Sequence, residues 1–206
     1  MISPKRARIA TTAFFFISGF GFSTWASRIP AIQDKLNLSD AGLGSALFAM
    51  PLGLMLTLPV TGFLLQRFSS RTIMFGGAIL FNVMLSLIGF VTAPWQLVVA
   101  LFFFGSSRNL MNISLNAQSV GVQALYERSI ITTFHGVWSI AGFAGAAVGS
   151  LMVSSDIDPS FHFFLAGAAL IGVGFWAVKD TIPQPPSDKD EKKALFCPTA
   201  PSLSLA

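Results

Sequence analysis

Six long apolar runs, separated by short polar connections, constrain this chain more than any other feature of its sequence. They cover residues 9–26, 41–65, 72–91, 96–123, 130–153 and 161–178. A helix of about 20 apolar residues crosses the hydrocarbon core of a bilayer, where the backbone has to satisfy its own hydrogen bonds. The runs therefore predict an all-α membrane protein with six transmembrane helices. Residues 1–8 are expected to be a cytoplasmic tail, and residues 179–206, rich in proline and charge, a disordered cytoplasmic tail.

The composition agrees with a membrane location and disfavours other classes of protein. Charged residues make up 11% of the chain, against about a quarter in a soluble domain. The net charge of +4 comes without a basic face or groove motif, so we expect no binding to nucleic acid. The single cysteine, Cys197, excludes an intramolecular disulfide and a multi-cysteine metal site.

Signatures of catalysis are missing from the sequence. It has no Ser/His/Asp set, no HExxH sequence and no glycine-rich phosphate loop followed by lysine. Gly105-Ser-Ser-Arg108 departs from the GxSG sequence of intramembrane serine proteases. We therefore expect no enzyme activity, no catalytic residues, no metal and no cofactor.

Basic residues gather in alternate connections, and cytoplasmic loops are the ones enriched in lysine and arginine. They occur in both tails, between the second and third runs, and between the fourth and fifth (Lys5, Arg6, Arg8, Arg67, Arg71, Arg128, Lys179, Lys189, Lys192, Lys193). We expect a multi-pass protein of the cell inner (plasma) membrane with both termini in the cytoplasm. A cleaved signal peptide is the alternative for the first run, but five further runs and the flanking Trp25 disfavour it.

The fourth run carries an arginine near its centre, Arg108, which costs roughly 2.5–3.5 kcal/mol on membrane-insertion scales. All nine acidic residues lie outside the six runs, so no carboxylate of this chain is expected to pair with it inside the membrane. Two interpretations stay open. Arg108 either bonds backbone carbonyls as a structural group, or it belongs to a ligand site or solute pathway, as ionisable groups inside membranes often do.

Amide side chains follow Arg108 along the same run. Asn109, Asn112 and Asn116 fall on one helical face, Gln118 lies beyond them, and His135 of the fifth run is expected at about the depth of Gln118. His135 is taken as the only side chain of the runs that titrates near neutral pH. These residues and Arg108 are predicted to line a hydrophilic substrate pathway. The alternative is that the amides and the imidazole only hold helices together.

Small residues recur at every fourth position of the fifth run, at Ala141, Gly145 and Gly149. This spacing places them on one stripe of a helix, where they let a second helix backbone approach closely. We expect them to form a helix-packing face.

The connection between the second and third runs reads Gly62-Phe-Leu-Leu-Gln-Arg67-Phe-Ser-Ser-Arg71. It resembles the cytoplasmic loop signature of the major facilitator superfamily (MFS), G-x-L-A-D-R-x-G-R-(R/K), which Gly62, Leu64, Arg67 and Arg71 match. Gln66, Ser69 and Ser70 replace the Asp, the second Gly and the first basic residue after it.

Two further segments, Trp25-Ala-Ser-Arg28-Ile-Pro30-Ala-Ile32 and His135-Gly136, resemble bacterial sugar-permease members of the fucose-permease-like branch. The resemblance implies one half of an MFS-type transporter fold. Transporters of this family have two six-helix halves around a central cavity, and helices one, four and five line it in this half. Gly136, Gly145 and Gly149 also match the spacing of the antiporter motif, but Ser150 replaces its proline.

The resemblance leaves two functions open. The first is a secondary transporter, or its truncated N-terminal half, that moves a small polar solute such as a sugar or organic anion by alternating access. The second is a degenerate or partner-dependent six-helix membrane protein without transport activity of its own. Residues 194–206 do not open a seventh span, so a fragment, a truncated gene product and a true half-transporter all fit. The expected partners are lipid, a small solute, and a second six-helix half or a second copy.

Overall fold

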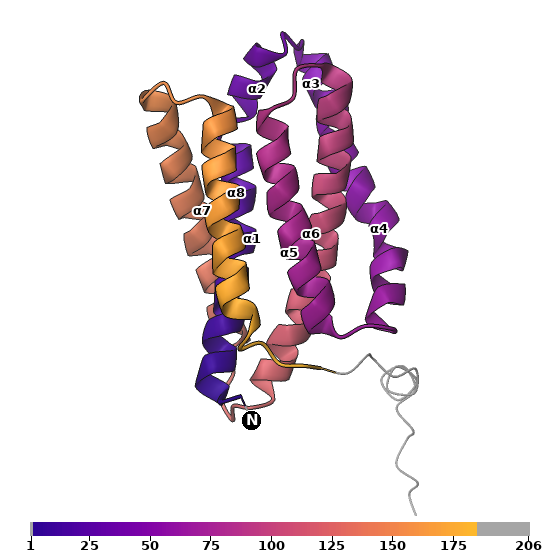
Figure 1. Ribbon diagram of the computed structural model, residues 1–206, viewed down its shortest axis with the longest axis vertical. Helices are drawn as coiled ribbons and strands as arrows, with labels where there is room; N and C mark the ends of the chain where they lie inside the picture. The colour runs from indigo at the N-terminus through magenta and orange to yellow at the C-terminus, as the bar shows by residue number, and fades with distance from the viewer. Residues whose placement is uncertain (1, 185–206) are drawn as a thin grey trace, which may run out of the picture.

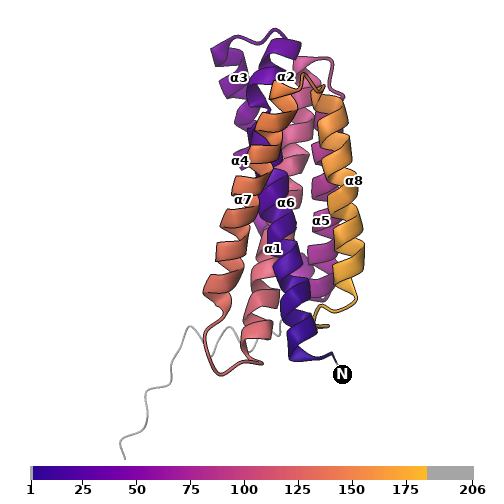
Figure 2. The same ribbon diagram turned by 90° about the vertical axis from the view of Figure 1, so that its left-hand side faces the viewer.

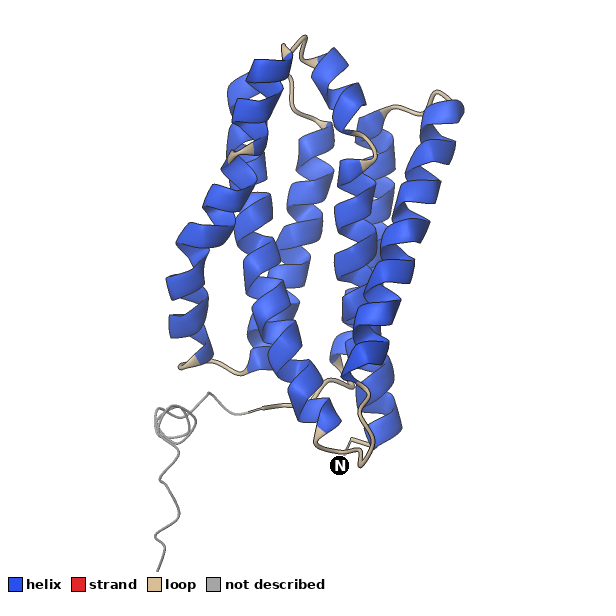
Figure 3. Cartoon of the chain, turned by 180° about the vertical axis from the view of Figure 1, so that it is seen from behind, coloured by secondary structure: helices blue, strands red, loops and turns tan. Residues whose placement is uncertain are grey.

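The computed structural model describes residues 2–184, and these form eight helices joined by short connections (Figure 3). The helices are α1 (Pro4–Ala26), α2 (Ile29–Lys35), α3 (Asp40–Leu47), α4 (Ala49–Leu65), α5 (Ser70–Gly89), α6 (Pro94–Gln123), α7 (Ile131–Ser154) and α8 (Pro159–Val178). Six helical stretches are long and apolar enough to cross a membrane, with α3 and α4 together making the second (Asp40–Leu65). This confirms the predicted all-α fold with six spans.

Local sequence explains where the helices begin and where the second span breaks. Ser3, Ser39 and Ser69 accept hydrogen bonds from the first turns of α1, α3 and α5, which satisfies free backbone N–H groups. The cap at Ser3 lets α1 begin at Pro4 rather than at residue 9. The second span is interrupted at Phe48 because Pro51 has no N–H for the carbonyl of Leu47 and its ring crowds that carbonyl.

In chain order the spans divide into two units of three: α1, α3–α4 and α5, then α6, α7 and α8. In space α1, α7 and α8 lie on one side of the bundle and α4, α5 and α6 on the other (Figure 1; side view in Figure 2). The middle helix of each unit packs against the first helix of the other, α4 against α6 and α7 against α1. The third helices, α5 and α8, pack against each other, and also against α6 and α1 respectively. This exchange is the arrangement of a three-plus-three repeat within one six-helix half.

Glycines let the exchanged helices cross at backbone contact. At the α4–α6 crossing, a Cβ on Gly105 would overlap the carbonyl oxygen of Met50, and one on Gly53 would overlap the carbonyl oxygen of Phe102. At the α1–α7 crossing, a Cβ on Gly145 would lie 2.6 Å from the carbonyl oxygen of Phe20. The predicted packing residues Ala141, Gly145 and Gly149 are all buried in α7.

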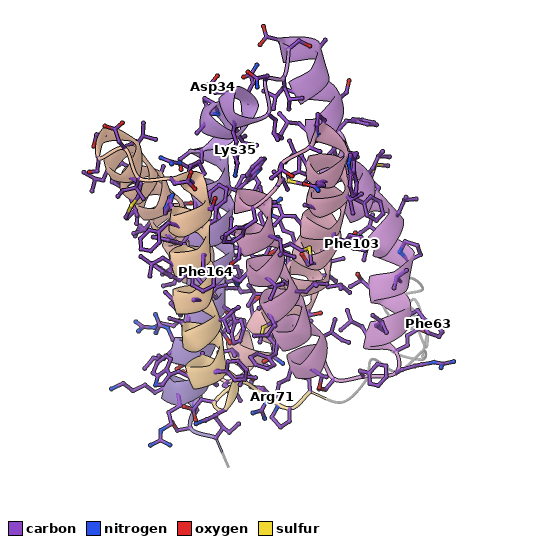
Figure 4. The ribbon with its side chains drawn as sticks, turned by 45° about the horizontal axis from the view of Figure 1, so that its top comes forward. Asp34, Lys35, Phe63, Arg71, Phe103 and Phe164 are labelled. Carbon is purple, nitrogen blue, oxygen red and sulfur yellow. The ribbon has the colours of Figure 1, made fainter. Side chains whose placement is uncertain are left out.

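The two ends of the bundle differ in charge. The N-terminus and the segment after α8 lie at the same end (Figure 1). Arg71 lies at that end, whereas Asp34 and Lys35 lie at the opposite one (Figure 4). Large aromatic side chains such as Phe103 and Phe164 are about half exposed on the sides of the bundle, where a membrane protein meets lipid.

The segment after α8 is attached to the bundle through residue 184. Ile182 exchanges two hydrogen bonds with the side chain of Gln118, and Gln184 accepts from Ser70 Oγ at 2.7 Å and donates to the carbonyl of Ala117 at 3.3 Å. The disorder predicted from residue 179 is therefore corrected for residues 179–184. The rest of that prediction lies outside the described residues.

Candidate functional site

A cavity of ≈ 220 Å³ lies between α1, α6 and α7. These are the first, fourth and fifth spans, for which the family resemblance implied this position. Its lining mixes aromatic, polar and cationic side chains: Phe15, Ser18, Arg108, Asn112, Leu115, Asn116, His135 and Trp138. The structure thus brings four of the six predicted pathway residues together in one cavity.

Among residues 2–184, Arg108 is the only lysine or arginine that lines this cavity, and none of the lining side chains is acidic. Its guanidinium carbon lies 4.2 Å from the centre of the Phe22 ring, a cation–π contact. The Nε atom is buried and has no hydrogen-bond partner within residues 2–184. No backbone carbonyl of the described chain accepts from it, so the structure does not show the carbonyl clamp that was one interpretation of this residue.

The amides of Asn112 and Asn116 are only partly used by the protein. Ser18 Oγ donates to Asn112 Oδ1 at 2.8 Å, and Asn116 Nδ2 donates to the backbone carbonyl of Asn112 at 2.9 Å. Among the described residues this leaves the nitrogen of the Asn112 amide and the oxygen of the Asn116 amide without a bond to protein. The cavity therefore offers both a donor and an acceptor to a polar solute.

His135 closes one side of the cavity from α7. Its exposed imidazole meets the ring of Phe15 edge-on, with centroids 5.3 Å apart, and Phe15 also stacks on Phe134 at 5.4 Å. Trp138 adds a second aromatic wall. Phe15, Ser18 and Trp138 were not predicted, because two aromatic residues and an isolated serine are common in apolar runs and do not stand out as candidates for a polar site.

Asn109 and Gln118, the other two predicted pathway residues, lie apart from this cavity. Asn109 is buried against α4, where its Nδ2 donates to Thr61 Oγ1 at 3.1 Å. Gln118 is fully buried near the α5 terminus; its Nε2 donates to Ser70 Oγ at 2.8 Å and to the Ile182 carbonyl at 2.7 Å. Both side chains hold protein segments together.

Replacing Gln118 by leucine is expected to lower the free energy of unfolding by about 1–3 kcal/mol, because buried polar groups of Ile182 and Ser70 lose their partner. The measurement is unfolding of detergent-solubilised protein. Asn116→Leu is the matched control on the same helix, since the exposed Asn116 amide bonds only within α6. Equal stability of the two variants would contradict a holding role for Gln118.

The predicted loop signature spans the end of α4 and the start of α5. Gly62 and Leu64 lie in the last turns of α4, with open space around Gly62. Arg67 follows in the turn, its guanidinium carbon 4.3 Å from the ring centre of Phe63, and Arg71 lies in the first turn of α5.

A second polar cluster lies at the opposite end of the bundle and was not predicted. Arg28 is 3% exposed and donates to the carbonyl of Ile157, while its Nε has no partner within the described chain. Burial lowers the pKa of Arg28, and the negative charge of the nearby Asp158 raises it in part. Hydrogen bonds from Ser160 hold the pKa of the Asp158 carboxyl below its usual value.

His162 of α8 belongs to the same region. It is 2% exposed, and neither ring nitrogen has a partner within residues 2–184. The sequence prediction named only His135 among the runs and left out this second histidine. The signal was present, since a single histidine interrupts the otherwise apolar run 161–178.

Comparison with known proteins gives a family and three relatives that agree with this arrangement of helices and cavity. The family model described as the Major Facilitator Superfamily matches residues 11–204. The chain is 31% identical over 153 residues to an uncharacterised MFS-type transporter of Yersinia pestis, which covers 74% of this chain and 40% of that protein. It is 30% identical over 172 residues to an uncharacterised transporter of Sinorhizobium fredii (84% and 45%) and 29% identical over 142 residues to the membrane protein MosC of Rhizobium meliloti (68% and 35%).

The chain thus spans less than half the length of each of these three relatives. What it does span is the six-helix arrangement with a polar cavity among its first, fourth and fifth spans. Together with the match over residues 11–204, this places the chain in the Major Facilitator Superfamily.

Proposed function

We propose that this chain acts in secondary transport, moving a small polar solute such as a sugar or an organic anion by alternating access. The observation that carries the proposal is the cavity that Arg108, Asn112, Asn116 and His135 share inside apolar spans. Polar groups at that depth are costly to keep unless they serve a solute or ion pathway. The resemblance of the segments Trp25–Ile32 and His135–Gly136 to bacterial sugar permeases supports this proposal.

The size and lining of the cavity fit a small solute. A volume of ≈ 220 Å³ has room for several water molecules or one small solute. The aromatic walls of Phe15 and Trp138 suit the apolar side of a short carbon chain or sugar ring, and the amides suit its hydroxyl groups.

A cysteine at position 116 tests whether this cavity is a water-filled pathway. In a Cys197→Ser background, Asn116→Cys should react with a charged, membrane-impermeant thiol reagent, because the reactive thiolate forms in water. Phe143→Cys is the control: Phe143 is 78% exposed on α7 without lining the cavity, so in a membrane it should face lipid and react far more slowly.

Equal labelling of the two cysteines, or none at position 116, would contradict a hydrophilic pathway. Protection of Asn116→Cys by a solute would identify a candidate substrate.

The same labelling reports orientation. We propose that both termini are cytoplasmic in the inner membrane, because basic residues occur in the first turn of α1 (Lys5), in the α4–α5 connection (Arg67) and in the α6–α7 connection (Arg128). A Lys5→Cys variant should then react in inside-out vesicles and not in right-side-out ones. The proposed protein partner is a second six-helix half or a second copy, and sedimentation of the purified chain distinguishes a dimer from a monomer.

A further inference from the structure

We infer that the cavity between α1, α6 and α7 takes a small hydroxylated carboxylate, whose single negative charge pairs with Arg108. This inference rests on the proposed transport function and narrows its substrate class. It excludes uncharged sugars as the preferred solute.

The balance of charge in the cavity is the first argument. Arg108 is partly buried, and in the described part of the chain neither an acidic side chain nor a second lysine or arginine lines the space around it. A buried cation without a counter-charge is unfavourable, and an anion that enters the site offsets this cost. A solute with one negative charge neutralises one guanidinium, whereas a dianion such as phosphate would leave an excess negative charge inside the membrane.

The free edge of the guanidinium is the second argument. Phe22 covers a face of the group at 4.2 Å, and the Nε atom is buried, so a solute in the cavity meets Arg108 at its terminal N–H groups. An arginine held by its face presents its N–H groups along its edge. The two oxygens of a carboxylate match that planar fork with parallel hydrogen bonds.

The amides define the remainder of the solute. With Ser18 on Asn112 Oδ1 and the Asn112 carbonyl on Asn116 Nδ2, the Asn112 amide nitrogen and the Asn116 amide oxygen have no bond to the described chain, so a donor group and an acceptor group are left for the solute. A hydroxyl group donates and accepts at once, so it can meet both. The solute therefore carries hydroxyl groups a short distance from its carboxylate.

Three pairs of solutes that differ mainly by a carboxylate test this inference: glycerate with glycerol, gluconate with sorbitol, and glucuronate with glucose. Binding is measured by calorimetry on the purified chain in detergent. At least one acid should bind at least about tenfold more tightly than its neutral partner, as expected for hydrogen bonds to a charged group. Arg108→Gln, which keeps hydrogen-bonding capacity but not charge, should weaken the binding of that acid by roughly 10- to 100-fold.

Arg108→Lys separates charge from shape. It keeps the cation but loses the planar fork, so it should recover only part of the lost affinity. Full recovery would overturn the bidentate geometry while leaving an anion preference.

Tighter binding of the neutral member in every pair, or no binding of any acid to the unaltered chain, would overturn the inference. Either result is separable from failure of the transport proposal, because labelling of Asn116→Cys is measured without solute. Loss of acid binding in Arg108→Gln counts as support only when the variant keeps the thermal unfolding midpoint of the unaltered chain.

Discussion

Gly105→Ala is expected to destabilise the protein by about 3 kcal/mol or more, although alanine is the better helix former. The added Cβ would overlap the carbonyl oxygen of Met50 and lie 2.9 Å from its carbonyl carbon. The obstacle is backbone on α4, which no side-chain rotation relieves, so α4 and α6 have to separate. The measurement is the thermal unfolding midpoint of the detergent-solubilised protein.

Gly172→Ala is the matched control for Gly105→Ala. It lies inside α8 with nothing within 4 Å of an added Cβ, so alanine there should be neutral or stabilise by up to about 1 kcal/mol. Gly53→Ala should resemble Gly105→Ala because its Cβ would meet the carbonyl of Phe102 at the same crossing. The double variant should lose less stability than the sum of the two single losses, because helices that one methyl group has already separated have room for the second.

Stability of Gly105→Ala equal to that of Gly172→Ala would show that α4 and α6 do not cross at backbone contact. Full additivity of Gly53→Ala and Gly105→Ala would show that the two glycines act at separate sites.

Arg108→Ala is expected to abolish solute binding without lowering the free energy of unfolding. The substitution removes the Phe22 contact, worth about 0.5–2 kcal/mol. It also removes a cation whose insertion costs roughly 2.5–3.5 kcal/mol. The two effects oppose each other, and no hydrogen bond from Arg108 to the described chain is lost.

Two measurements on each variant separate the roles of Arg108: the unfolding midpoint in detergent, and binding of whichever solute protects Asn116→Cys. Phe22→Leu is a useful companion, because it should loosen the guanidinium and weaken binding without removing the charge. A destabilised Arg108→Ala that still binds solute would make Arg108 a structural group. Asn116 and His135 would then be the better candidates for the pathway.

The cavity lies at the boundary between the two crossed helix pairs. Gly53 and Gly105 hold α4 on α6, and Gly145 holds α7 on α1, while the cavity is lined by α6 on one side and by α1 and α7 on the other. A solute that contacts Arg108 and His135 together therefore touches both pairs.

The sequence by itself determined the spans, the class of fold and the presence of one cation, Arg108, inside a span. These follow from quantities that are local along the chain: the length of an apolar run set against bilayer thickness, and the cost of one charge within such a run. The stripe Ala141, Gly145 and Gly149 is local in the same sense, because a four-residue spacing puts three residues on one face of α7 whatever surrounds it.

Only the tertiary structure decided which polar residues share a site. Asn109 and Asn116 are two helical turns apart on one face of α6, yet Asn109 meets Thr61 where α6 crosses α4, and Asn116 meets the cavity beside α1 and α7. Gln118 binds Ile182, which is far away in sequence. Helical periodicity gives the direction of a side chain, but its partner depends on the crossing helix, and crossings are set by backbone contacts between distant segments.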